Sequence, residues 1–258
     1  MAAPSAVLQS EWTKVKSVRS TVWTLTLALL LTVVVSGLIC LAYRINWDDM
    51  SLTDKFTFDP TNTSLAGLFL GQLALIAFGT LLIASEYSTG MIRTSLAAVP
   101  QRTTFYVCKA AVAAALTFVI GIVISFVSFF VGQGVLSGHK TASLGDAHVV
   151  RALVGAAIYM TLMVLFAYGV ATMVRSPMVA LGTLIPFFFI VSSILSAIPG
   201  VKKVAKYLPD QAGQKIMQVV ADPDNHTSYG PWGGIAIMAV WVAAALLGGF
   251  VLLKSRDA

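Results

Sequence analysis

Six long stretches without a charged side chain constrain this chain more than any other feature of its sequence. None contains Asp, Glu, Lys or Arg: Ser20–Tyr43, Pro60–Ser85, Ala110–His139, Ala152–Val174, Ser176–Val201 and Asn225–Leu253. The shortest has 23 residues, and a helix of about 20 apolar residues crosses the roughly 30 Å of hydrocarbon in a bilayer. The sequence therefore predicts an all-α polytopic membrane protein with six transmembrane helices.

The composition excludes a large domain outside the membrane. The chain is 57% hydrophobic and 11% charged, with a mean hydropathy of +0.85, whereas soluble domains carry about 25% charged residues. The stretches leave about 100 residues for both membrane faces, too few for an ordinary catalytic domain. We expect one transmembrane domain over residues 1–258, with spans near 21–43, 62–85, 108–132, 152–174, 178–198 and 231–253.

The distribution of basic residues predicts the orientation in the membrane. An even number of spans places both termini on one side. Lys and Arg favour the cytoplasmic side, most strongly in short segments. Three basic residues precede the first span and three more lie in the loop 86–109, whereas four of the opposite side's lysines share one long loop. We therefore predict a plasma-membrane protein with both termini in the cytoplasm.

Residues 5–19 are predicted to form an amphipathic helix on the inner membrane surface. Its apolar residues keep near-helical spacing while its charged residues face elsewhere: Leu8, Trp12, Val15 and Val22 against Glu11, Lys14 and Lys16. A basic tail that only sets the orientation is the alternative interpretation.

The segment 201–220, between spans five and six, contains a second interfacial element. Pro209 divides it into two short pieces, and in the first piece three lysines oppose apolar residues. This pattern predicts a piece that lies flat in the outer interface or dips into the membrane as a re-entrant element.

The membrane stretches lack the groups that would power or catalyse a reaction. Ion-coupled transporters generally need ionisable side chains at membrane depth, and the six stretches contain no Asp, Glu, Lys or Arg. No G-x-x-x-x-G-K-[ST] phosphate loop or H-E-x-x-H pattern occurs, and His139 and His148 have no partner cysteines for a metal. We expect no catalytic residue, metal, cofactor or nucleic-acid partner, so energy for uphill transport must come from another protein.

Two features of the spans are candidates for a substrate pathway, with ordinary packing as the alternative. Gln72 lies deep in the second span, where its amide must face protein or a wet cavity. Pro186 removes a helix hydrogen bond and precedes Phe187 and Phe188 in the fifth span, so it predicts a kink there.

The inner loop from Glu86 to Arg102 is more elaborate than a simple connection. Gly90 can end the second span, residues 91–98 suit a short helix, and Pro100 stops that helix. Such a helix would present apolar side chains beside a basic one, namely Met91, Ile92 and Leu96 with Arg93. The segment would either provide a docking surface for a partner protein or be a loop that merely lies on lipid headgroups.

This loop, Glu86-Tyr-Ser-Thr-Gly-Met-Ile-Arg-Thr-Ser-Leu96 with Pro100 and Arg102, resembles the permease subunit of bacterial ABC-2 type ABC transporters, in the style of actinobacterial members. The entry Glu11-Trp-Thr-Lys14 and the six-span layout extend the resemblance over essentially the whole chain. In that family the loop carries a coupling helix that docks into a separate ATPase subunit.

The resemblance implies the partners and the site. ATP and Mg would bind to the cytoplasmic ATPase, and the permease would pair in the bilayer as a homodimer or heterodimer. The implied function is export of a hydrophobic or amphipathic compound, such as a drug, antibiotic or peptide. The coupling residues would be Glu86, Tyr87, Gly90, Met91, Ile92, Arg93, Leu96, Pro100 and Arg102. A non-transporting scaffold or immunity-type binding protein is the alternative, and a lipid-modifying enzyme would need polar catalytic residues that the sequence does not offer.

Overall fold

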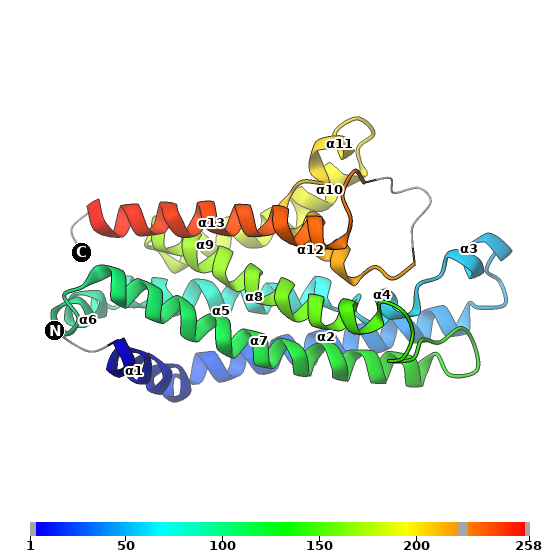
Figure 1. The fold of residues 1–258 in the computed structure, drawn as a ribbon, viewed down its shortest axis with the longest axis horizontal. Coiled ribbons are helices and arrows are strands. Elements are labelled where there is room, and N and C mark those ends of the chain that lie inside the picture. Colours follow the sequence, from blue (N-terminus) through cyan, green and yellow to red (C-terminus); the bar gives the residue numbers. More distant parts are fainter. Residues whose placement is uncertain (1–3, 221–226, 256–258) are drawn as a thin grey trace.

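The computed structural model is an elongated helical bundle and describes residues 4–220 and 227–255 (Figure 1). Six helical segments are long and apolar enough to cross a membrane. They are α2 (Arg19–Ile45), α5 (Leu68–Ser88), α7 (Arg102–Val135), α8 (Val149–Val174), the continuous segment Pro177–Ala197, and α13 (Pro231–Ser255). The predicted all-α six-span fold is confirmed. The first residues of the last charge-free stretch, from Asn225, lie outside the described part.

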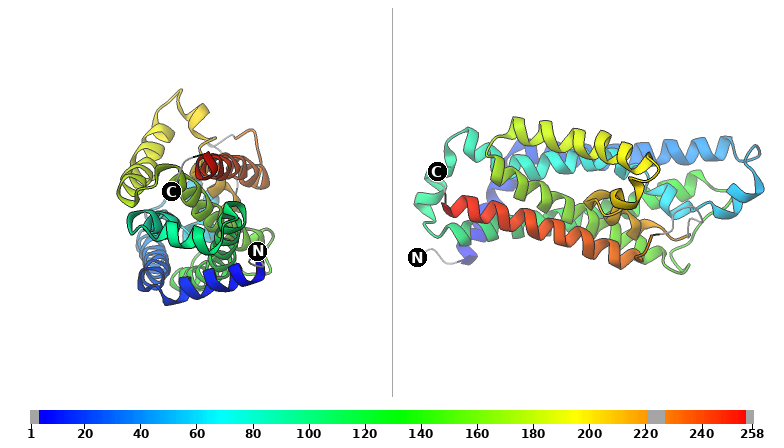
Figure 2. Two further views of the ribbon diagram at one scale, coloured as in Figure 1. Left: turned by 90° about the vertical axis from the view of Figure 1, so that its left-hand side faces the viewer. Right: turned by 90° about the horizontal axis from the view of Figure 1, so that it is seen from above.

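Short helices occupy the two ends of the bundle. One end carries α1 (Pro4–Ser17) and α6 (Met91–Ala98), which lie across the bundle axis in Figure 2. The opposite end carries α3 (Leu52–Thr57), α4 (Pro60–Ser64), α11 (Lys202–Ala205) and α12 (Pro209–Gln214), the last followed by a 3₁₀ turn (Lys215–Met217). We call these the α6 end and the α12 end.

Helix α8 forms the centre of the bundle. It packs against α5, α7 and α13, and its side chains Tyr159, Met160 and Met163 are fully buried. Small residues allow this close packing. A Cβ atom added to Gly169 of α8 would lie 2.6 Å from the carbonyl carbon of Ala245 in α13.

The second span begins later than the sequence suggested, at Leu68 rather than near residue 62. Residues 60–64 form the separate helix α4, because Asp59 caps its first turn and Pro60 occupies the first helical position. The chain then passes close to α2, where the Gly67 N–H donates to Ser36 Oγ at 3.0 Å. A Cβ on Gly67 would lie 2.1 Å from the Thr32 carbonyl oxygen, so only glycine fits there.

The fifth span changes its helical winding at Pro186. Helix α9 (Pro177–Pro186) leads into a π-helical stretch (Phe187–Val191) and then α10 (Ser192–Ala197). Proline lacks an N–H and therefore cannot complete the α-helical ladder, and π turns accommodate such interruptions. The interruption that Pro186 predicted is present.

The segment between spans five and six divides at Pro209, as the sequence predicted. The apolar residue Val204 of α11 is exposed, as in an interfacial helix. In contrast, α12 enters the bundle and packs against α8 and α13, burying Asp210, Ala212 and Gly213. The second piece is therefore part of the bundle rather than an exposed loop.

We predict that Gly169→Ala destabilises the bundle by about 1–3 kcal/mol, because the new methyl group overlaps the α13 backbone. Gly182→Ala in α9 is the matched control, since none of the described atoms lies within 4 Å of its added Cβ. The control should be neutral or slightly stabilising, because alanine favours a helix. Thermal unfolding of the purified variants in detergent measures the difference, and equal melting temperatures would contradict the close packing.

Candidate functional site

Helix α1 attaches to the bundle through one face that includes a charged residue. Val7, Glu11 and Val15, spaced four residues apart, are buried where α1 packs against α7, while Leu8 and Trp12 are partly exposed. The expectation that Glu11 faces away from the packed side was wrong. A helical spacing of four places residues on one face whatever their polarity, and a partner inside the bundle compensates the charge.

That partner is Lys109, the centre of a four-residue ion network. The Lys109 ammonium donates to Glu11 Oε2 at 2.5 Å and to Glu86 Oε1 at 2.6 Å. Lys14 lies 3.0 Å from Glu11 Oε1 and 3.5 Å from Glu86 Oε1. Two cations and two carboxylates thus join α1, the end of α5 and the start of α7.

Three of the four network residues lie away from solvent, and Lys14 is partly exposed. The exposed fractions of Lys109, Glu11 and Glu86 are 2%, 2% and 7%. Burial lowers the pKa of Lys14, but the Glu11 and Glu86 carboxylates outweigh this effect and raise it above its usual value. Two ammonium groups face two carboxylates, so the formal charges of the network balance. Removal of Lys109 alone would leave the buried carboxylates with less compensation.

The network is not saturated with hydrogen bonds. Glu86 Oε2 is buried and accepts no hydrogen bond from the described residues. A cavity of about 270 Å³ between α1, α2 and α5 borders all four charged side chains. The carboxylates therefore have both an unused acceptor and space in which to rearrange.

The loop after α5 forms the predicted short helix, α6. Gly90 has φ +72°, a left-handed conformation that ends α5 and starts α6 and that side-chain-bearing residues rarely adopt. Val99 before Pro100 leaves the helical conformation, and α7 begins at Arg102. Lys14 donates to Ser95 Oγ at 3.3 Å, so the ion network also contacts α6.

Only part of the expected docking surface on α6 faces outward. Ile92 is buried among Ile83, Phe105 and their neighbours, and Leu96 packs against the same cluster. Met91 is 50% exposed, and Arg93 lies on the surface beside it. The hydrophobic pattern alone could not distinguish the inward side chains from the outward ones, because all three apolar residues lie within two turns.

The basic residues at this end also hold helix α13 in place. Arg102 donates to the carbonyl oxygens of Leu253 at 2.7 Å and Lys254 at 3.2 Å. Arg175 donates to the Leu252 carbonyl at 3.1 Å, and its guanidinium lies 5.2 Å from the ring centre of Tyr87. The last carbonyls of a helix lack partners within it and carry partial negative charge, which explains the two arginines. Through its contact with Arg175, Tyr87 connects the end of α5 to the end of α13.

The three candidate pathway residues lie inside the subunit. Gln72 is buried and accepts a hydrogen bond from the Tyr159 hydroxyl of α8. Phe188 is buried against Phe166 of α8, with Phe187 beside it. The structure does not gather the three residues around a cavity.

The sequence analysis identified Glu86 but missed Glu11 and Lys109 as its network partners. Lys109 counted only as one of several basic residues that set the orientation. A signal existed: Lys109 lies within the first turns of an apolar helix, and Glu11 and Glu86 are two of only three acidic residues assigned to that membrane side. A basic residue placed between apolar helical positions needs an acidic partner.

The amino-acid sequence matches one known protein family. Residues 7–196 match the model of the ABC-2 family transporter proteins. The chain belongs to this family. It is a multi-pass membrane protein with a permease role, and the family implies a partner ATPase. A search among curated proteins finds no match.

We predict that Lys109→Met destabilises the protein by about 3–5 kcal/mol, because it leaves two carboxylates buried against one remaining ammonium group. The control Lys16→Met removes an exposed lysine and should cost less than about 1 kcal/mol. The triple variant Glu11→Gln, Glu86→Gln, Lys109→Met should recover most of the loss, since the one network charge that remains, Lys14, is partly exposed to solvent. Melting temperatures in detergent test all three, and a wild-type value for Lys109→Met alone would refute the energetic role of the network.

Proposed function

We propose that this chain forms the substrate pathway of an ATP-driven exporter, with both termini in the cytoplasm, and that α6 docks into a separate ATPase subunit. The observation that carries the proposal is the ion network beneath α6. It links the exposed helix that a partner could push to three further helices: α1, α5 and α7. A docking helix without such links could move without moving the bundle.

The network offers a way to pass on that movement. If the ATPase subunits close on ATP, α6 is displaced together with Ser95 and the end of α5 that carries Glu86. Pulling Glu86 away from Lys109 would strand buried charges, so the helices move together rather than separately. The unused oxygen of Glu86 and the adjoining cavity provide for a second arrangement of the same charges. Two such arrangements would correspond to inward- and outward-facing states.

A second permease subunit completes the pathway in this proposal. Helix α8 fills the centre of the bundle with buried side chains, so a passage between two subunits fits better than one through a single subunit. The partner would be a second copy or a related permease, together with two ATPase subunits that bind ATP and Mg. The spans carry few fixed charges, which favours a hydrophobic or amphipathic substrate such as a drug, antibiotic or peptide.

We predict that Arg93→Glu weakens association with the ATPase about tenfold, since arginines at interface centres often contribute 1–2 kcal/mol or more. A candidate ABC ATPase would be co-expressed with the chain, and the complex purified through a tag on either subunit. Lys16→Glu is the matched control, because it reverses an exposed charge on α1 at the same end.

Two outcomes would contradict the proposal. Failure of the two wild-type proteins to co-purify would remove the coupling role of α6. An ATPase inactivated in its nucleotide site that still supports the cellular phenotype would indicate a scaffold or immunity-type protein rather than a pump.

We predict that a cysteine at Ala97 of α6 is inaccessible from outside intact cells. The native Cys40 and Cys108 are buried and give little background. Asp48→Cys, exposed beyond the far end of α2, is the matched outer position and should react with a membrane-impermeant maleimide. Ala97→Cys should react only after permeabilisation, and the reverse pattern would overturn the orientation.

A further inference from the structure

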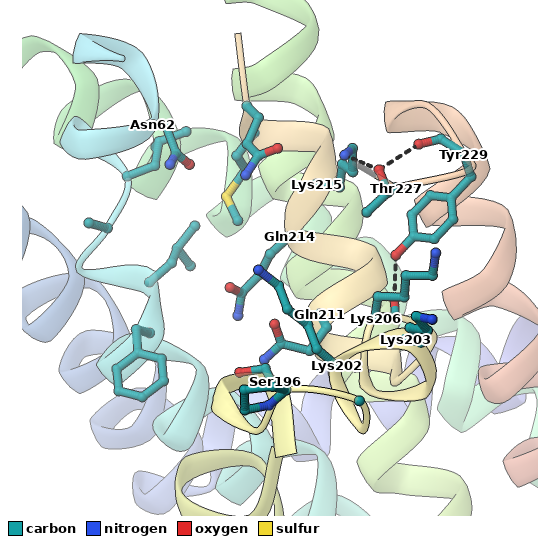
Figure 3. A pocket seen from close by; sticks show the side chains of 18 residues that line it. Asn62, Ser196, Lys202, Lys203, Lys206, Gln211, Gln214, Lys215, Thr227 and Tyr229 are labelled. Atoms are coloured by element: carbon teal, nitrogen blue, oxygen red, sulfur yellow. Dashed lines mark hydrogen bonds between the residues drawn. The ribbon is translucent and has the colours of Figure 1, made fainter. Parts of the chain in front are cut away.

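The α12 end contains a second cavity, separate from the ion network. It has a volume of about 630 Å³ and lies between the start of α5, the α10–α11 connection and α12. Figure 3 shows Asn62 on one side of it, with Gln211 and Gln214 projecting from α12 on the other. Nothing in the coupling proposal uses this cavity.

Four lysines line the cavity: Lys202, Lys203, Lys206 and Lys215. Its described lining residues include no carboxylate. In Figure 3, Lys202 extends beside Gln214, while Lys203, Lys206 and Lys215 lie toward Tyr229. Like charges gathered around a recess with low-dielectric walls produce a positive potential that favours an anion.

Two carboxylates near the cavity, Asp59 and Asp210, are not among its lining residues. Asp59 accepts from the backbone N–H groups of Val219 and Val220 at 2.6 and 2.9 Å, and its other oxygen caps α4. Asp210 is buried, which raises its pKa; its Oδ2 accepts from Ser192 and Gln211, while its Oδ1 accepts no hydrogen bond from the described residues. Because neither carboxylate lines the cavity, neither competes there with the negative charge of a ligand for the lysines.

The two glutamines that project from α12 toward the cavity are held in position by hydrogen bonds to residues inside the bundle. The Gln214 amide donates to the Tyr159 hydroxyl at 3.3 Å, and the Gln211 amide donates to Ser192 Oγ at 3.2 Å. These side chains are therefore already ordered before a ligand binds, which lowers the conformational entropy that binding costs.

The opposite wall is apolar and continues to the outside of the bundle. Leu65 and Leu68 line this wall and are buried, whereas Phe69 is 38% exposed. The ring centres of Phe69 and Phe189, in the fifth span, are 5.1 Å apart. An occupant can thus place an anionic group near the lysines and an apolar part along Phe69 toward the lipid.

We propose that this cavity binds an amphiphile with a phosphate headgroup, as in an anionic membrane lipid. Lys202 and Lys203 attract the headgroup, and the Phe69 wall holds the first part of its acyl chains. The site requires neither the ATPase nor transport, so it stands or falls independently of the coupling role of α6.

Titration of the purified full chain in nonionic detergent, read by native mass spectrometry, tests the proposal. The probe is dioctanoyl phosphatidylglycerol. Dioctanoyl phosphatidylcholine has the same chains without net charge, and inorganic phosphate has the charge without chains. Phosphatidylglycerol should bind more tightly than phosphatidylcholine, and an equal concentration of inorganic phosphate should not displace it.

The double variant Lys202→Gln, Lys203→Gln should weaken phosphatidylglycerol binding about 25-fold, since each lysine beside an anionic headgroup contributes roughly fivefold. Both side chains are exposed, so folding should be unaffected. The matched control is Lys16→Gln, Lys55→Gln, which removes the same charge outside the cavity and should bind as the wild type does. Phe69→Ser should weaken binding of the lipid through loss of the apolar wall.

Three results would overturn the proposal. Wild-type affinity of the Lys202/Lys203 variant, or an equal loss in the control, would show that the cavity does not hold the headgroup. Equal binding of phosphatidylcholine would remove the requirement for negative charge. Full displacement by inorganic phosphate, with no effect of Phe69→Ser, would indicate a small-anion site instead.

Discussion

The buried contact of Lys109 with Glu11 and Glu86 is the interaction on which the α6 end depends. It fixes α1 to the bundle, holds the end of α5 beside the start of α7, and through Lys14 contacts α6. In an apolar bundle this arrangement is costly to form and more costly to break, because a single removed partner strands a buried charge. Its position under α6 is what makes it the connection between a partner and the spans in the coupling that we propose.

The two ends of the bundle use lysine in different ways. At the α6 end, Lys109 is enclosed and neutralised by carboxylates, so it joins helices. At the α12 end, Lys202 and Lys203 line a recess whose described lining has no carboxylate, which favours an anionic ligand. The same residue type thus stabilises structure where it is paired inside, and supports binding where it faces an open recess.

Several features followed directly from the sequence, while their packing did not. The interruption at Pro186, the break at Gly90 and the division at Pro209 depend on backbone constraints that one residue imposes. The start of the second span was misplaced, because the close approach of Gly67 to α2 is a contact between helices distant in sequence. The outward face of α6 likewise depends on such contacts, whereas the charges of Glu11 and Lys109 only indicated that each needs a partner.

The sequence by itself determined the six-span all-α membrane fold, because hydrophobic length and the absence of charge act locally along the chain. Only the tertiary structure decided which charges meet. Lys109 is 98 residues from Glu11 and 23 from Glu86, and such pairings depend on how helices pack. The network and the lysine-lined cavity are products of that packing.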